Sequence, residues 1–175
     1  MLKIILIVIA LLVAIVIVLA VLKPDTFRVE RSTRIKASPD KVFALINDFN
    51  RWGSWSPWEK MDPAMQRTFS GAPSGKGSVY EWKGNSKVGE GRMEILESAP
   101  STRITIKLDF LKPFEAHNVA DFRLEPQGGE TAVTWTMQGP ASFVVKIMHV
   151  FMDMDRMVGK DFEAGLANMK AVAEK

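Results

Sequence analysis

A run of nineteen apolar residues near the N-terminus constrains this chain more than any other feature of its sequence. The segment from Ile4 to Leu22 contains no charged residue, glycine, proline or polar side chain. As an α-helix it would be about 28 Å long, close to the hydrocarbon thickness of a bilayer. A helix that is apolar on every side has no face to present to water. We therefore expect a single-pass membrane protein with a transmembrane anchor at residues 1–23 and one soluble domain at residues 24–175.

A cleaved secretory signal is the alternative for this segment, because Lys3 and the terminal amine place positive charge ahead of the apolar run. The run is longer than the apolar part of most signal peptides, and no small-x-small cleavage pattern precedes Lys23. The side of the membrane that holds the domain stays open. Basic residues between Lys23 and Lys36 favour a cytoplasmic domain, whereas a very short N-terminal tail often directs the downstream domain across the membrane.

Charge and composition argue against several classes of function. The chain of 175 residues has 23 Lys and Arg against 20 Asp and Glu and shows no basic cluster, so nucleic acid is not an expected partner. It has no cysteine, which removes disulfides and thiolate chemistry. Its two histidines lack metal-binding spacing and no phosphate-binding glycine loop is present, so neither a metal nor a cofactor is predicted. The sequence leaves any protein partner unknown.

The periodicity of the remaining sequence changes along the chain. Residues 26–36 alternate with period two, which is typical of a half-buried strand. The tripeptide Ser38-Pro39-Asp40 supplies the cap and first turn of a helix of about three turns. Between residues 65 and 139, short alternating segments separated by Gly, Pro and Asn predict an antiparallel meander. From residue 144 to residue 173, apolar residues recur at helical spacing and predict one long C-terminal helix.

This order of elements resembles the helix-grip fold of the START-like superfamily, also called SRPBCC, and its polyketide cyclase/dehydrase-like branch. The stretches that carry the resemblance are ASPDKVFALINDFNRWGSWSPW, GSVYEWKGN, VGEGRMEI, TAVTWTMQG and DFEAGLANMK. The resemblance implies an α+β fold in which a curved antiparallel sheet wraps around a long C-terminal helix. It also implies that lipids, sterols, polyketides or other apolar molecules bind between the sheet and that helix. Only some members of the superfamily catalyse a reaction there.

Strand and helix periodicity, combined with this fold, assigns residues to the inner face of the domain. The candidate ligand-binding residues are Tyr80, Trp82, Met93, Ile106, Phe110, Phe122, Trp135 and Met137 on strands, with Phe151, Met154 and Phe162 on the C-terminal helix. Aromatic and methionine side chains suit an adaptable apolar pocket. The same residues also suit a filled core, and the sequence leaves both possibilities open. Gly89 and Gly91, on the same face as Met93, slightly favour space that side chains do not fill.

Three tryptophans spaced three apart lie beyond the first helix of the soluble part. Trp52, Trp55 and Trp58 suit a short 3₁₀ turn with their rings on one side. They could form the lip of a ligand entrance or a belt at the membrane interface. The favoured interpretation is that they close one end of the core.

The sequence offers few groups for acid–base chemistry. His117 and Asp121 are four apart on one strand and would share a face, which makes a base oriented by a carboxylate conceivable, although an ordinary surface pair is favoured. His149 suits the surface or boundary of the last helix. Further carboxylates would reach a cavity only if the strand register slipped by one residue: Glu90, Glu94, Asp109 and Glu115.

The expected function is a membrane-anchored binding or transfer domain for a small apolar or lipid-like ligand. Residues 4–22 would provide the membrane contact. A polyketide cyclase/dehydrase-like enzyme is an alternative, but the inner face lacks the convergent base and donors that such chemistry needs. A cavity-free interaction or regulatory domain at the membrane is the other alternative.

Overall fold

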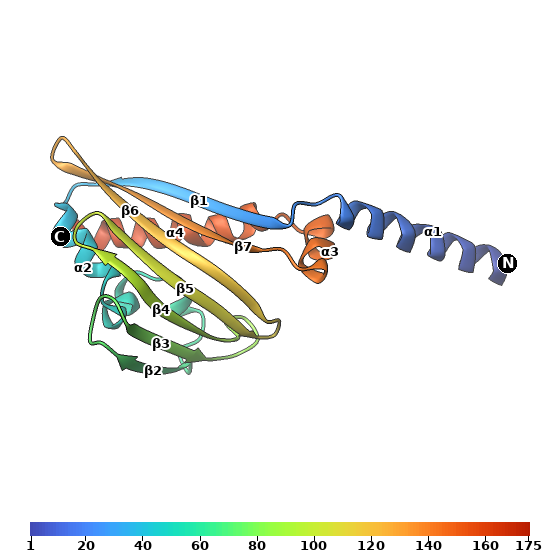
Figure 1. Ribbon diagram of the computed structural model, residues 1–175, viewed down its shortest axis with the longest axis horizontal. Coiled ribbons are helices and arrows are strands. Elements are labelled where there is room, and N and C mark those ends of the chain that lie inside the picture. Colours follow the sequence, from blue (N-terminus) through green and yellow to red (C-terminus); the bar gives the residue numbers. More distant parts are fainter.

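The computed structural model describes residues 1–175 and shows an N-terminal helix that projects from one end of a curved sheet with its own helices (Figure 1). This helix, α1 (Leu2–Val21), extends away from the sheet, and Ala20 near its C-terminal end is buried. Its mean hydropathy of 3.8 and its length suffice for a membrane span, although a signal sequence near an N-terminus has the same properties.

Seven antiparallel strands form a single sheet in the order β1-β7-β6-β5-β4-β3-β2. The strands are β1 (Thr26–Ile35), β2 (Gln66–Gly71), β3 (Ser78–Lys83), β4 (Glu90–Ala99), β5 (Arg103–Lys112), β6 (Ala116–Gln127) and β7 (Glu130–Pro140). Strands β2 to β7 form the predicted meander, and β1 closes it by pairing with β7 from Thr26↔Pro140 to Ile35↔Thr131. A register shift in β4 between Ile95 and Glu97 increases the bend of the sheet. The predicted α+β helix-grip fold is confirmed.

The segment after β1 begins a helix where the sequence predicts it. The helix α2 (Pro39–Ile46) starts after Ser38, whose hydroxyl accepts a hydrogen bond from the Lys41 backbone N–H at 3.4 Å. It is shorter than expected, because the Asp48 side chain accepts from the Asn50 backbone N–H at 2.9 Å and starts a 3₁₀ helix instead. The 3₁₀ helices η1 (Phe49–Ser54) and η2 (Trp58–Lys60) come next in the chain.

The prediction of one long C-terminal helix is wrong, since the segment forms two helices. These are α3 (Phe143–Phe151) and α4 (Met154–Ala173). Between them Met152 has extended backbone angles, and the Asp153 carboxylate caps α4 by accepting from the Arg156 backbone N–H at 3.0 Å. Only α4 lies along the sheet, whereas α3 packs against α1 (Figure 1).

The hydrophobic core lies between the concave face of the sheet and the helices α2, η1 and α4. Trp52 and Trp55 are buried in this core, as the favoured interpretation predicts, whereas Trp58 is half-buried and packs against it. The indole N–H groups of the two buried tryptophans donate to the carbonyls of Ile46 and Leu45, each at 2.9 Å. No residue of α1 or α3 belongs to the core cluster of 25 buried residues. The core of the domain is therefore complete without the N-terminal helix.

One glycine of α4 allows the helix to approach the sheet closely. A Cβ at Gly165 would lie 2.9 Å from Cζ3 of Trp135 and 3.1 Å from Cδ of Pro57. The indole of Trp135 is in turn stacked against the ring of Phe162, with centroids 4.0 Å apart. This stack fixes the height of α4 above the sheet and so defines the space beside it.

Candidate functional site

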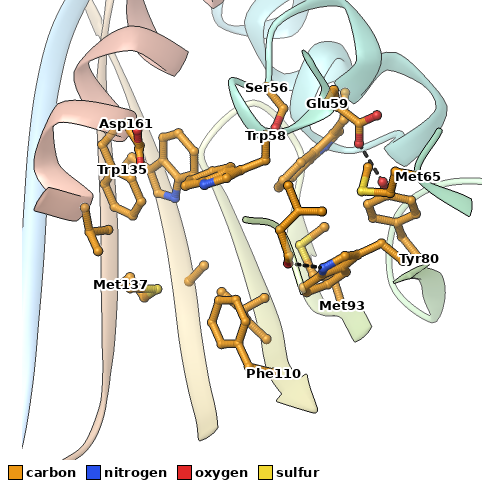
Figure 2. Close-up of a pocket in the computed structure, with 17 residues that line it drawn as sticks. Ser56, Trp58, Glu59, Met65, Tyr80, Met93, Phe110, Trp135, Met137 and Asp161 are labelled. Atoms are coloured by element: carbon orange, nitrogen blue, oxygen red, sulfur yellow. Dashed lines mark hydrogen bonds between the residues drawn. The ribbon is translucent and has the colours of Figure 1, made fainter. Parts of the chain in front are cut away.

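A cavity of about 160 Å³ lies between the sheet, the 3₁₀ helices and the first half of α4 (Figure 2). Of the 17 residues that line it, 14 are hydrophobic. The lining consists of Trp52, Ser56, Trp58, Glu59, Met65, Tyr80, Trp82, Val88, Met93, Leu108, Phe110, Ala120, Trp135, Met137, Val158, Asp161 and Phe162. The interior is thus not completely filled by side chains.

Most of the inner-face residues proposed from the sequence line this cavity. Those at its wall are Tyr80, Trp82, Met93, Phe110, Trp135, Met137 and Phe162. Ile106 and Phe122 have no exposed surface and belong to the filled core instead.

Two further candidates, Phe151 and Met154, lie outside the cavity. Phe151 is 70% exposed at the end of α3, so its expected position against the sheet is wrong. Met154 is half-buried in the first turn of α4. The interruption between α3 and α4 explains both placements, because it turns the preceding helix away from the sheet.

The space expected beside Gly91 is occupied. A Cβ at Gly91 would lie 2.3 Å from the six-membered ring of Trp82, whose indole N–H donates to the Val88 carbonyl at 3.0 Å. Gly91 therefore makes room for an aromatic side chain and leaves no hole. Gly89 serves the turn before β4, where its positive φ of 65° suits glycine.

A polar cluster forms one end of the cavity wall (Figure 2). The Tyr80 hydroxyl donates to one carboxylate oxygen of Glu59 at 2.6 Å, and the Arg67 guanidinium donates to the other at 2.6 Å. The Glu59 side chain is only 9% exposed. Burial, with the neighbouring carboxylate, raises the pKa of Tyr80, so its hydroxyl remains a protonated donor at neutral pH. Sequence reasoning missed Glu59, because it lies in a three-residue 3₁₀ helix without periodicity.

A second polar position lies on α4. Asp161 lines the cavity, and burial raises the pKa of its carboxyl group with no neighbouring cation to oppose the shift. The indole N–H of Trp135 is also buried without a hydrogen-bond partner. The pocket therefore combines an apolar body with an uncompensated carboxyl and with the Glu59–Tyr80 pair. Asp161 follows Val158 by three residues, so it borders the apolar stripe of the helix, a signal that sequence reasoning did not use.

The acid–base pair proposed from the sequence is not formed. His117 Nδ1 lies 2.7 Å from Asp109 Oδ1, its direct cross-strand neighbour, while Asp121 accepts from Arg103 at 2.6 Å. The hydrogen bond with Asp109 raises the pKa of His117. None of these residues lines the cavity, and neither do the other proposed carboxylates, Glu90, Glu94 and Glu115. His149 is half-buried, its ring centroid 6.1 Å from that of Phe27. No cluster of three or more His, Asp or Glu could hold a metal ion.

A curved antiparallel sheet that wraps around a C-terminal helix, with an apolar cavity between them, defines a helix-grip domain of the SRPBCC class. Residues 26–174 match the family described as "Polyketide cyclase / dehydrase and lipid transport". The chain belongs to this family. No curated protein matches the sequence at a significant level.

Solved structures support the assignment of the fold. Protein CV1439 from Chromobacterium violaceum aligns with a TM-score of 0.60 at 15% identity, covering 87% of this chain and 99% of that one. The major latex-like protein 151 from Panax ginseng aligns with a TM-score of 0.59 at 16% identity, covering 87% and 100%. The di-domain ARO/CYC StfQ from the steffimycin biosynthetic pathway aligns with a TM-score of 0.60 at 10% identity, covering 85% of this chain and 51% of that one. At such identities the likeness concerns the fold alone.

Proposed function

We propose that this protein binds a small apolar ligand in the cavity between the sheet and α4, and that α1 holds the domain at a membrane. The observation that carries the ligand proposal is the cavity itself, with 14 hydrophobic residues among its 17 lining residues. Family membership agrees with it, because the family description includes lipid transport.

The size and chemistry of the cavity narrow the class of ligand. A volume of about 160 Å³ corresponds to about five water molecules in the liquid and is close to that of a cavity that holds benzene. It is smaller than the ~300–1,000 Å³ of most ligand pockets. Three flexible methionines in the wall, Met65, Met93 and Met137, can move to admit a longer molecule. We infer a ligand with a ring or acyl segment and a polar group that reaches Glu59 or Asp161.

The anchoring proposal rests on the properties of α1 and on its separation from the core. An apolar helix of 20 residues matches the thickness of a bilayer, and no residue of α1 belongs to the core of the domain. Residues 1–23 are thus proposed as a membrane anchor and residues 24–175 as the ligand-binding domain. Reporter proteins fused to the C-terminus, read on each side of the membrane, would determine the orientation of the domain.

Mass spectrometry of co-purifying molecules tests the ligand proposal. Met93→Trp places a large ring in the cavity, whereas Leu96→Trp makes the same change on β4 at a site that is 37% exposed. Both variants and the parent protein are purified from the same membranes and extracted with organic solvent. We expect an apolar molecule in the parent and in Leu96→Trp, and none in Met93→Trp. An identical extract from all three proteins would contradict the proposal.

An enzymatic role in cyclisation or dehydration is the second candidate, and Asp161 is the observation that favours it. A carboxyl group in an apolar pocket with a raised pKa is a common form of general acid or base. The family description also names cyclases and dehydrases. Incubation with a poly-β-ketone thioester tests this role. Asp161→Asn should abolish cyclised product while leaving binding intact, and a parent protein that forms no product would leave binding as the supported function.

A further inference from the structure

The most exposed large hydrophobic side chains outside α1 lie at one end of the domain. Outside residues 1–22, the five most exposed are Phe151 (70%), Phe114 (59%), Val144 (54%), Leu111 (53%) and Phe143 (49%). We call these five residues the apolar end patch. Three belong to α3, Leu111 lies near the end of β5, and Phe114 lies in the turn between β5 and β6. Figure 1 places α3 and this turn at the end of the sheet from which α1 extends.

The helix α3 is amphipathic, but its polar side faces the protein and its apolar side faces outward. A helix at the surface of a soluble protein directs its polar side chains to water and its apolar ones inward. In α3 the Lys146 side chain is only 12% exposed and pairs with Asp25, in the connection between α1 and β1. His149 turns its buried Nε2 into the protein and packs near Phe27. The outward positions are left to phenylalanine and valine, an arrangement that suits a lipid environment better than water.

The position of α3 along α1 gives its depth in a membrane. Val16 and Ala20 are the only residues of α1 that are not exposed, and being four apart they form the face on which α3 packs. Val16 precedes the end of the apolar run at Leu22 by six residues, or about 9 Å of helix. Helices that lie in a membrane interface bury their apolar face about 5–10 Å deep. With α1 spanning the bilayer, α3 lies at that depth.

The opposite end of the domain provides the internal comparison. The turn between β6 and β7 there consists of Gly128 and Gly129 between Gln127 and Glu130. None of these residues is large and apolar. The turn at that end therefore lacks the exposed apolar side chains that the turn between β5 and β6 carries.

We infer that the apolar end patch is a second membrane-binding surface, which inserts into the interface of the same bilayer that α1 spans. The inference rests on the anchoring proposed above and adds a fixed orientation of the domain to it. It also brings the pocket close to lipid, because Phe110 of the cavity wall directly precedes Leu111 of the patch.

Fluorescence quenching by lipids tests this inference with the full chain. The protein has no cysteine, so a single introduced cysteine accepts one environment-sensitive nitrobenzoxadiazole label. Labels are placed through Phe151→Cys and Phe114→Cys in the patch, Gln127→Cys at the far end, and Leu11→Cys in α1. Each protein is reconstituted into phosphatidylcholine vesicles with and without lipid that carries a nitroxide near the start of its acyl chain. Circular dichroism verifies that each variant is folded.

We expect the labels at positions 151 and 114 to be quenched several-fold more strongly than the label at position 127. Equal quenching at these three positions, with strong quenching at position 11, would overturn the inference while leaving the anchor intact. A label at position 151 that is shielded from water but not quenched would also overturn it, since a second copy or a protein partner would then cover the patch. Absence of quenching at position 11 would instead remove the anchoring proposal, and this inference with it.

Discussion

Filling the cavity with Ala120→Leu distinguishes an open pocket from a tightly packed core. Ala120 is 4% exposed, lines the cavity, and lies between Ile106 and Met137 on the neighbouring strands. A longer side chain at this position extends into the space that a ligand would occupy. Leucine is therefore expected to stabilise the ligand-free domain and to prevent binding.

The magnitude is set by the volume of the cavity. At about 24 cal/mol per Å³, an empty space of about 160 Å³ costs the folded state up to about 4 kcal/mol. Leucine adds three carbon atoms, each worth about 0.8 kcal/mol when buried, or about 2.4 kcal/mol in total. Imperfect fit and loss of rotamer freedom reduce this gain. We expect the free energy of unfolding to rise by about 1–2 kcal/mol.

Urea denaturation of the domain, followed by tryptophan fluorescence, measures this change. The matched control is Ala173→Leu, because Ala173 is 1% exposed in the core but does not line the cavity. Overpacking at that site should lower the free energy of unfolding by about 1–3 kcal/mol. Equal destabilisation by both substitutions, with ligand binding unchanged in Ala120→Leu, would refute the description of this space as a binding cavity.

Three further predictions concern the anchor, the pocket carboxyl and the packing of the sheet. A chain that begins at Lys23 should be soluble, folded and monomeric, whereas the full chain should stay with membranes through a carbonate wash; a mature protein that lacks residues 1–22 would instead identify a signal peptide. Burial raises the pKa of Asp161, so the folded state binds the Asp161 proton more tightly than the unfolded state does. The contribution of this proton to stability is therefore complete below the ordinary pKa of 3.8. It is lost as the pH rises through the pKa of the folded state. Asp161→Asn should therefore stabilise the domain at neutral pH and flatten the decline of the urea midpoint as the pH rises above the ordinary carboxyl value of 3.8. An unchanged pH profile would contradict the burial of the Asp161 carboxyl group. Gly91→Ala should destabilise the domain by about 1–3 kcal/mol, because its Cβ would lie 2.3 Å from the ring of Trp82, whereas Gly53→Ala, with no atom within 4 Å, should be nearly neutral in the same denaturation assay.

The sequence predicts those parts of the fold that local interactions determine. Ser38 caps α2 because a hydroxyl followed by proline satisfies a helix start within four residues. The strand faces are given by alternation, and the buried positions of Trp135 and Met137 agree with it. The ligand-binding role of the inner face remains a proposal, because periodicity indicates which side chains are buried. It does not indicate whether a ligand or other side chains lie against them.

The polar groups of the pocket could not be predicted in the same way. Glu59 reaches the cavity because η2 turns back over the sheet and Tyr80 lies beneath it, a contact between residues 21 apart. The partner of His117 depends on the register of β5 and β6, which places Asp109 directly opposite. Residues four apart on one strand, such as His117 and Asp121, share a face of the sheet but are too far apart along the strand to be direct neighbours. Side-chain pairs in a sheet form across strands, so the pair proposed along the strand was the wrong one.

The division of the C-terminal segment shows which information an apolar repeat lacks. Residues 144–173 keep one helical apolar stripe, although the chain stops one helix and starts another within it. The start was visible in the sequence, because Asp153 is a good cap and Asp155 places an acid in the first turn. The sequence did not show that the apolar side of α3 faces away from the sheet. A helical period shows that one face is apolar, and both a protein core and a lipid interface satisfy that condition. The ion pair of Lys146 with Asp25 turns the polar side of α3 toward the protein, so its apolar side faces outward and does not join the core.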